Sequence, residues 1–248
     1  SLHDALPITH WQLLAWEVPL AEGDLPAQAR AEPAAALAEA VRQTLRRHAA
    51  MFIGIQEATA LLTRASADVP DVVKEVLRAL QMQRVAEVLR RLVAEEVSIR
   101  NLRDILEALA EAAQREKDVQ ALTEMARIAL KRQLSHRAAP GGTLRALLLA
   151  PELEDTLRQA VRVQGGVAQL ALEPELARRI VDDVAALVTR HRPQALVCGV
   201  DVRWHLRRLI ETECFETPVM SFHELMPALR LETAAHVPLP AAVLLEAA

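Results

Sequence analysis

Cysteine and long apolar runs are scarce in this chain of 248 residues. The only cysteines, Cys198 and Cys214, form no CxxC pair. Two isolated cysteines provide no disulfide framework and are typical of proteins of a reducing compartment. No apolar run approaches the ~20 residues that a membrane-spanning helix needs, so the sequence predicts no membrane span within it.

Positive charge is also in short supply, with 29 lysines and arginines against 33 aspartates and glutamates. The formal net charge is −4 and the pI is about 6.1. Proteins whose main partner is nucleic acid or an anionic membrane usually carry a basic surface. The charge balance therefore argues against both partners.

Catalytic and cofactor-binding motifs are absent: there is no GxGxxG, GxxxxGK[ST], HExxH or GxSxG. Ser135 and His136 are adjacent, and neighbours on a helix point about 100° apart, so they cannot form a nucleophile–base pair alone. The eight histidines include no pair at the i, i+4 spacing of metal ligands. We interpret Glu95 and Glu96 as a solvated helix face and Gly165-Gly166 as a turn. The sequence thus predicts no enzyme and no bound metal or cofactor.

The chain is long enough to bury a substantial core, and chains of this length tend to divide into more than one compact unit. Residues 1–8, SLHDALPI, resemble a translated sequencing adapter and are set aside. The natural protein is then expected to extend upstream. His10 to Leu20 is rich in aromatic and aliphatic residues and precedes a turn-like Glu22-Gly23-Asp24, which predicts one strand.

Helical periodicity dominates from Ala34 to about Ala139. Ser98 is a suitable N-cap for a helix with a clean apolar face, and Asp118 is a suitable N-cap for the next one. Pro140-Gly141-Gly142 ends the helical block. Beyond it, strand-like runs at Leu144–Leu149, Ala195–Val200, PVMSF and ALRLE alternate with helical segments, an order typical of a small α/β unit.

The arginine-rich helices leave two interpretations open. Arg100 and Arg103 lie on one side of their predicted helix, and Arg203, Arg207 and Arg208 lie together on theirs. Salt bridges within the protein or at an interface are favoured, because aromatic interleaving and net positive charge are both lacking. The alternative is a soluble α-helical regulatory domain that binds nucleic acid, for which steep salt dependence would be diagnostic.

Seven sequence blocks follow one another along the chain: FIGIQEATALL, PDVVKEVLRAL, VSIRNLRDILEALAE, EKDVQALTEMARIALKRQLSHR, LALEP, VDVRWHLRRLIE and PVMSFHELMPALRLE. In order and spacing they resemble the cytosolic domain of the type III secretion export-gate family, FHIPEP. The resemblance covers nearly all of the chain from His10 to Val237. The motifs FIGIQE, SIRNLR and EKDV are more similar to the virulence-type branch of the family than to the flagellar one.

The resemblance implies an α+β, mainly α, module of four subdomains with a central helical bundle and a small C-terminal α/β subdomain. Residues 9–30 and 77–96 would form the first, truncated subdomain. Residues 31–76 would form the second, helical subdomain. Residues 97–140 would form the third, also helical, and 141–240 the fourth, an α/β unit.

The resemblance also implies the role and the partners. In the family such modules assemble into a nonameric ring, and they receive chaperone–substrate complexes, the gatekeeper and the switch protein. No catalysis is attributed to the module in the family, and we expect no cofactor and no nucleic-acid partner. The full-length protein would lie in the bacterial inner membrane, which it would reach only through membrane helices upstream of this cytoplasmic segment.

Site residues follow from the resemblance by position. The chaperone cleft would include Phe52, Gln83 and Arg84, although composition alone favours Phe52 as a core residue of its helix. The ring interface would include Arg100, Arg103 and Glu107. Two family motifs depart here: EYVR is Glu124-Met125-Ala126-Arg127, and SYQEL is Ser221-Phe222-His223-Glu224-Leu225. The chain has no tyrosine at all.

Overall fold

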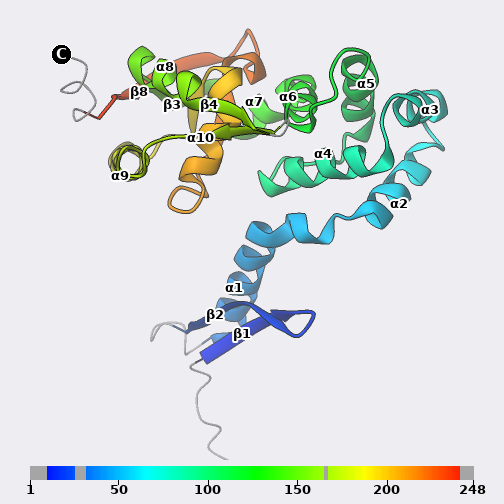
Figure 1. Ribbon diagram of the computed structural model, residues 1–248. Helices are drawn as coiled ribbons and strands as arrows, with labels where there is room; N and C mark the ends of the chain where they lie inside the picture. The colour runs from blue at the N-terminus through cyan, green and yellow to red at the C-terminus, as the bar shows by residue number, and fades with distance from the viewer. Residues whose placement is uncertain (1–9, 26–31, 165–166, 241–248) are drawn as a thin grey trace, which may run out of the picture.

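The structure is a computed structural model that describes residues 10–25, 32–164 and 167–240. A β-hairpin and a long helix lead into a lobe of packed helices, and an α/β lobe follows (Figure 1). The architecture is the predicted α+β, mainly α, fold. The adapter-like residues 1–8 and the predicted turn at Gly165-Gly166 lie outside the described residues, and the division into four subdomains stays a prediction.

The first element is a hairpin, which corrects the prediction of one strand from His10 to Leu20. Strand β1 (His10–Ala15) pairs antiparallel with β2 (Val18–Asp24). The chain reverses at Trp16 and Glu17, whose φ angles of 48° and 66° lie in the left-handed region. Non-glycine residues adopt that region rarely, so the apolar run gave no sign of a turn there.

Five helical segments follow the hairpin, and the last three of them, α2 to α4, already belong to the helical lobe. Prolines occupy the first positions of α1 and α3, where their missing N–H has no helical partner to lose. Gly54 precedes α2, and its N–H donates to the Glu57 carboxylate at 2.9 Å. The segments are α1 (Pro33–His48), η2 (Ala49–Phe52), α2 (Ile55–Ala65), α3 (Pro70–Ala79) and α4 (Met82–Ala94).

Three further helices complete this lobe: α5 (Leu102–Ala112), α6 (Val119–Ala129) and α7 (Lys131–Ala138). Asp118 caps α6, as predicted, by accepting from the N–H of Ala121 at 2.9 Å. The prediction of Ser98 as an N-cap was wrong, because α5 begins after Asn101, whose side chain accepts from Asp104 N.

The α/β lobe is built on a parallel sheet in the order β7-β6-β3-β8. Each of the predicted strand-like runs after residue 140 overlaps one of its strands, which confirms the α/β pattern. The strands are β3 (Thr143–Leu149), β6 (Ala195–Cys198), β7 (Val219–Ser221) and β8 (Arg230–Val237).

The sheet is shared between two apolar cores. In β6, Ala195 and Val197 pack with the helical lobe, whereas Leu196 and Cys198 pack with the outer helices of the α/β lobe. This alternation is the period of two expected for a strand buried on both faces. The outer helices are α8 (Pro151–Ala160), α9 (Pro174–His191) and α10 (Val200–Ile210).

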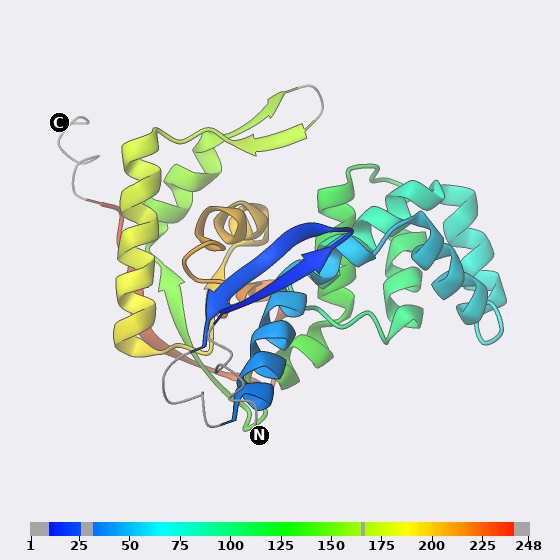
Figure 2. The same cartoon turned by 90° about the horizontal axis from the view of Figure 1, so that it is seen from below.

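A second hairpin projects from the α/β lobe near one end of α9 (Figure 2). It consists of β4 (Val161–Gln164) and β5 (Val167–Leu170), paired antiparallel. Among the described helices, none is both long enough and apolar enough to cross a membrane.

Candidate functional site

Phe52 lies on the surface, not in the core of its helix. It ends η2, its exposed fraction is 41%, and its ring centroid is 5.8 Å from that of Trp16 in the β1–β2 turn. Trp16 itself is 72% exposed. The two rings therefore form an exposed aromatic pair that joins the hairpin to the start of the helical lobe.

Exposed apolar side chains concentrate in the same part of the chain. Of the eleven large hydrophobic residues that are exposed in the described structure, seven precede residue 56. Monomeric proteins rarely leave such side chains grouped on the surface without a binding role. The seven are Leu14, Trp16, Val18, Leu45, Met51, Phe52 and Ile55.

Gln83 and Arg84 lie in the first turn of α4, and both are exposed. The Arg84 guanidinium donates to the carbonyl oxygen of Lys117, in the loop before α6. Arg84 lines a cavity with residues that include Asp118 and Trp204, and this cavity contains neither Phe52 nor Gln83. The cavity that Arg84 lines is therefore separate from the Trp16–Phe52 pair.

Arg100, Arg103 and Glu107 are all exposed. Arg100 and Arg103 line a hollow between the end of α2 and the start of α5, and Glu107 follows one turn later on α5. None of the three forms a salt bridge within the described part of the chain. Their charges are thus available to a partner.

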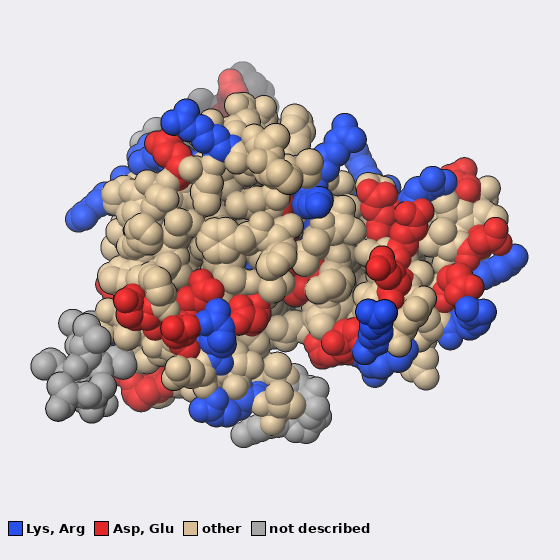
Figure 3. Space-filling model, turned by 90° about the horizontal axis from the view of Figure 1, so that it is seen from above, with Lys and Arg blue, Asp and Glu red and all other residues tan. Residues whose placement is uncertain are grey.

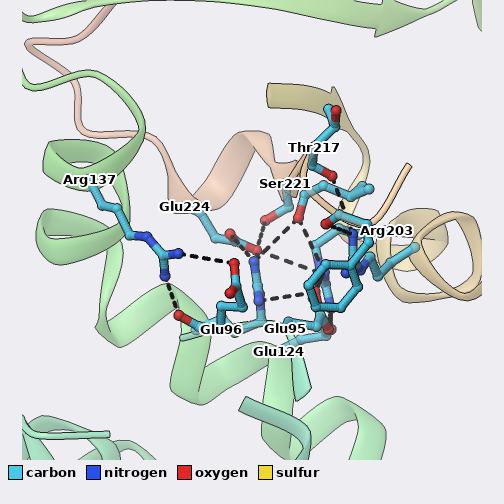
Figure 4. A network of polar contacts seen from close by, with 12 residues as sticks. Glu95, Glu96, Glu124, Arg137, Arg203, Thr217, Ser221 and Glu224 are labelled. Atoms are coloured by element: carbon cyan, nitrogen blue, oxygen red, sulfur yellow. Dashed lines mark hydrogen bonds and ion pairs between the residues drawn. The ribbon is translucent and has the colours of Figure 1, made fainter. Parts of the chain in front are cut away.

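The sequence did not reveal a buried ion network that joins the two lobes (Figure 4). At its centre, Arg203 of α10 donates from Nε and Nη2 to the two carboxylate oxygens of Glu124 in α6, both at 2.6 Å. Its Nη1 and Nη2 donate to Glu95, which directly follows α4, at 2.6 and 2.9 Å. Such paired guanidinium–carboxylate bonds are among the strong hydrogen bonds of proteins, because both partners are charged.

A second arginine extends this network. Arg127 of α6 donates to Glu224 at 2.8 and 3.1 Å and to Glu95 at 3.2 Å. Glu224 ends the short helix η3 (Phe222–Glu224), is fully buried, and also accepts from Ser221 Oγ at 3.2 Å. Segments far apart in sequence are therefore fixed to one another through charge.

Burial and the neighbouring arginines have opposite effects on the pKa values of these carboxyl groups. Burial would raise the pKa of Glu95, but Arg203 and Arg127 outweigh it and lower that pKa from 4.5 to about 2. Burial raises the pKa of Glu124, although bonds from Arg203 oppose the shift. The two carboxylates that share Arg203 are thus shifted in opposite directions.

This network corrects one interpretation and supports salt bridges as the role of the arginines on α10. Glu95 is not on a solvated face, because its side chain is only 10% exposed. Arg203 and Arg207 are buried and cannot reach a phosphate backbone, whereas the exposed Arg208 pairs with Glu211 at 2.6 Å. On the face shown in Figure 3, acidic and basic side chains are interspersed over the helical lobe. The nucleic-acid alternative therefore loses its main support.

Met125 and Phe222 stand where the two family motifs have tyrosine, and neither residue belongs to the ion network. Met125 and Phe222 are 41% and 46% exposed, respectively. The charged ends of the same motifs, Glu124, Arg127 and Glu224, point inward to the ion pairs. The substitutions of tyrosine therefore change the surface and leave the ion pairs in place.

A comparison with protein families gives a match over most of the chain: the model described as FHIPEP family matches residues 26–230. Invasion protein InvA of Salmonella typhimurium is 40% identical over 186 residues, which cover 73% of this chain and 27% of that protein. Protein hrpC2 of Xanthomonas euvesicatoria is 37% identical over 232 residues, 92% of this chain and 36% of that protein. The chain thus spans only about a third of the length of such relatives.

Solved structures share the fold. The CdsV protein of Chlamydia pneumoniae has a TM-score of 0.81 and 28% identity, covering 94% of this chain and 82% of that one. The complex of CdsV with CdsO from the same organism gives 0.80 and 28%, covering 92% and 80%. The nonameric EscV cytosolic domain from the type III secretion system gives 0.66 and 31%, covering 77% and 57%.

Proposed function

Because this chain belongs to the FHIPEP family, we propose that it forms the cytosolic docking and ring domain of a type III secretion export gate. In this role it receives chaperone–substrate complexes for export across the inner membrane and catalyses no reaction. The similarity to the EscV cytosolic domain supports the secretion role. The similarity to an invasion protein supports the virulence-type branch.

The observation that carries the docking role is the exposed aromatic pair of Trp16 and Phe52. Aromatic side chains contribute much of the binding energy at protein interfaces, and they contribute most when neighbouring apolar residues exclude water around them. The other exposed apolar side chains of the hairpin, α1 and η2 belong to the same stretch of the chain and would provide such neighbours. We assign the chaperone-docking surface to this region, with Phe52 as an anchor and with Gln83 and Arg84 as more distant contributors.

The ring role is supported by the exposed charges of the α5 region. Arg100, Arg103 and Glu107 have no ion-pair partner in the described part of their own chain, and charges of both signs suit the contact of identical subunits. We propose that they form salt bridges with neighbouring copies in a nine-membered ring like that of EscV. Gatekeeper and switch proteins would then bind the assembled ring. The solved complex of CdsV with CdsO supports the binding of further proteins to such a domain.

The docking role is tested by titrating a purified chaperone–substrate complex from the same genome into this chain. Replacing an aromatic anchor commonly costs roughly 1–3 kcal/mol of binding free energy, so Phe52→Ala should weaken binding about 5- to 150-fold. Phe222→Ala is the matched control, since Phe222 is 46% exposed but lies in η3 of the other lobe. Equal affinity of wild type and Phe52→Ala, or equal loss in both variants, would remove Phe52 from the docking surface.

A further inference from the structure

The cavity that Arg84 lines is an open hollow of about 430 Å³ between the helical lobe and the β4–β5 hairpin. One side of α4 and the first turn of α6 form its wall in the helical lobe. Trp204 of α10 and Ala168 of β5 form its wall in the α/β lobe. Its volume is within the range of binding sites.

One wall of this cavity is the free edge of a strand. The N–H of Ala171 donates to the carbonyl oxygen of Ala160 at 2.9 Å, and three steps further along the same hairpin Val163 opposes Ala168. Hydrogen-bonded and non-hydrogen-bonded pairs alternate in an antiparallel ladder, so Val163 and Ala168 direct their N–H and C=O groups outward. In the described chain β5 pairs with β4 alone. The outward groups of Ala168 are therefore open to a further strand.

The opposite wall carries three arginines and two carboxylates, and both carboxylates are already engaged. Glu87 accepts from Arg90 and, at 2.9 Å, from Nε of Arg91. Asp118 accepts from a backbone N–H at the start of α6. Because the arginines outnumber the carboxylates, this wall is positive overall.

Arg84 is the arginine of this wall that has no carboxylate partner. No salt bridge among the described residues includes it, whereas Arg90 and Arg91 share Glu87. Its guanidinium donates to the carbonyl oxygen of Lys117, which uses one of five N–H donors. Since the side chain is exposed, a carboxylate that enters the cavity can reach the remaining donors.

Trp204 supplies the apolar part of the site. Its ring lies 5.2 Å from the Arg91 guanidinium, which holds the two side chains together across the lobe boundary. The ring is only partly buried and lines the cavity together with Val119 and Ala168. An aromatic wall beside a strand edge suits the side chains of an extended peptide.

We propose that an extended segment of another protein binds in this cavity as a third strand beside β5, with one acidic side chain paired to Arg84. Strand addition takes its affinity from main-chain hydrogen bonds and its specificity from alternate side chains. Ala168 supplies the main-chain groups, Arg84 selects the acid, and Trp204 contacts an apolar neighbour. The site is separate from the Trp16–Phe52 pair. Its failure would therefore leave the docking role, which is tested through Phe52, unaffected.

The direct test is an array of acetylated hexapeptides in which one glutamate moves through a background of threonine and valine, residue types that favour strands. A matched array carries glutamine in place of glutamate. Anisotropy of the fluorescently labelled peptides measures their binding to the full chain. We expect at least one glutamate peptide to bind saturably and its glutamine counterpart to bind about fivefold or more weakly, because a charge-assisted hydrogen bond is lost.

The role of Arg84 is tested by Arg84→Gln, which should remove the preference for glutamate over glutamine. Arg162→Gln is the matched control, since Arg162 is an exposed arginine of the same hairpin that does not line the cavity. Its guanidinium contacts backbone carbonyl oxygens of its own segment. The control should keep the preference, so a general loss of positive charge is distinguished from loss of the site.

The role of the strand edge is tested by Ala168→Pro. The change removes an outward N–H and leaves the ladder to β4 intact, as edge positions allow. It should weaken every bound peptide at least about fivefold. Val163→Pro is the matched control, because it removes the outward N–H of the opposed residue on the far edge and should leave affinity unchanged.

Circular dichroism checks that the proline variants fold. If either does not, peptides N-methylated at alternate residues test the same backbone bonds in the wild-type protein and should bind weakly in one of the two methylation registers. The proposal is overturned if no glutamate peptide binds saturably, if glutamine peptides bind equally well, or if the preference for glutamate survives Arg84→Gln. Unchanged affinity in Ala168→Pro, or of both N-methylated registers, would overturn it as well.

Discussion

Arg203 and Glu124 face each other fork to fork across the boundary between the two lobes, with both hydrogen bonds at 2.6 Å. The side chains are 0% and 6% exposed, respectively. Burying each charged group costs desolvation free energy, and the attraction between the opposite charges offsets that cost. The relative position of the α/β and helical lobes is therefore fixed by charge as well as by the shared sheet.

Arg203→Met should destabilise the protein by roughly 3–5 kcal/mol, because Glu95 and Glu124 would be left buried without their main counter-ion. Urea unfolding measures the change. Arg178→Met is the control: Arg178 pairs with Glu175 at 2.7 Å on the exposed side of α9, and such pairs contribute about 1 kcal/mol or less. Similar losses in both variants would contradict the role assigned to burial.

Acid should weaken the network through Glu95. Its pKa falls from 4.5 to about 2 on folding, so its contribution is complete above pH 4.5 and disappears as the pH falls towards 2. The shift corresponds to a contribution on the order of 3 kcal/mol. Glu95→Gln should flatten the loss of stability across this pH range, measured by urea unfolding at several pH values.

Glu175 provides the comparison for that measurement. Hydrogen bonds from Arg178 and Arg179 also lower its pKa to about 2, but Glu175 is exposed and solvent screens its charge. Glu175→Gln should therefore change the pH profile little, and less still at high salt. An unchanged profile in Glu95→Gln would show that the acid response arises elsewhere.

Phe52→Ala should leave the fold nearly as stable as before. Deleting a core phenylalanine costs roughly 3–5 kcal/mol, but Phe52 is 41% exposed, so we expect a loss of about 1 kcal/mol. Thermal unfolding separates these values. A loss in the core range would return Phe52 to the core role that composition favours.

Self-association should be weak in the isolated chain and should depend on Arg103. A chain that is free in solution lacks the high local concentration that tethering to a common support would give, so monomers should dominate at micromolar protein. Sedimentation across a concentration series should show association that Arg103→Glu reduces and that Arg178→Glu, an exposed change on α9, does not. Equal association of all three proteins would place the ring contact elsewhere.

The sequence predicts the fold well wherever the signal is local. The change of period after Pro140-Gly141-Gly142 and the apolar run of β6 are such signals, and the structure confirms both. The hairpin turn at Trp16 and Glu17 was missed because its residues have no turn propensity and adopt a conformation that only tertiary context enforces.

The candidate sites were harder to predict because their partners are distant. Glu95 and Arg203 are 108 positions apart, and the sequence around either residue does not indicate that the two form a pair. A usable signal did exist: Arg203, Leu206, Arg207 and Ile210 recur at helical spacing on one buried face. A charge on such an apolar face indicates a buried pair, although it does not identify the partner.

The strand order β7-β6-β3-β8 has a consequence for biosynthesis. On a translating ribosome, β3 emerges first of the four strands, yet one of its edges stays open until the chain has been made as far as Val237. At ordinary elongation rates that interval is on the order of ten seconds. During it the nascent chain displays an apolar strand with unpaired backbone groups, which is the kind of segment that chaperones bind and that aggregates when they do not. We therefore expect release of unfinished chains before β8 to yield aggregates even though every helix of the first lobe is already present.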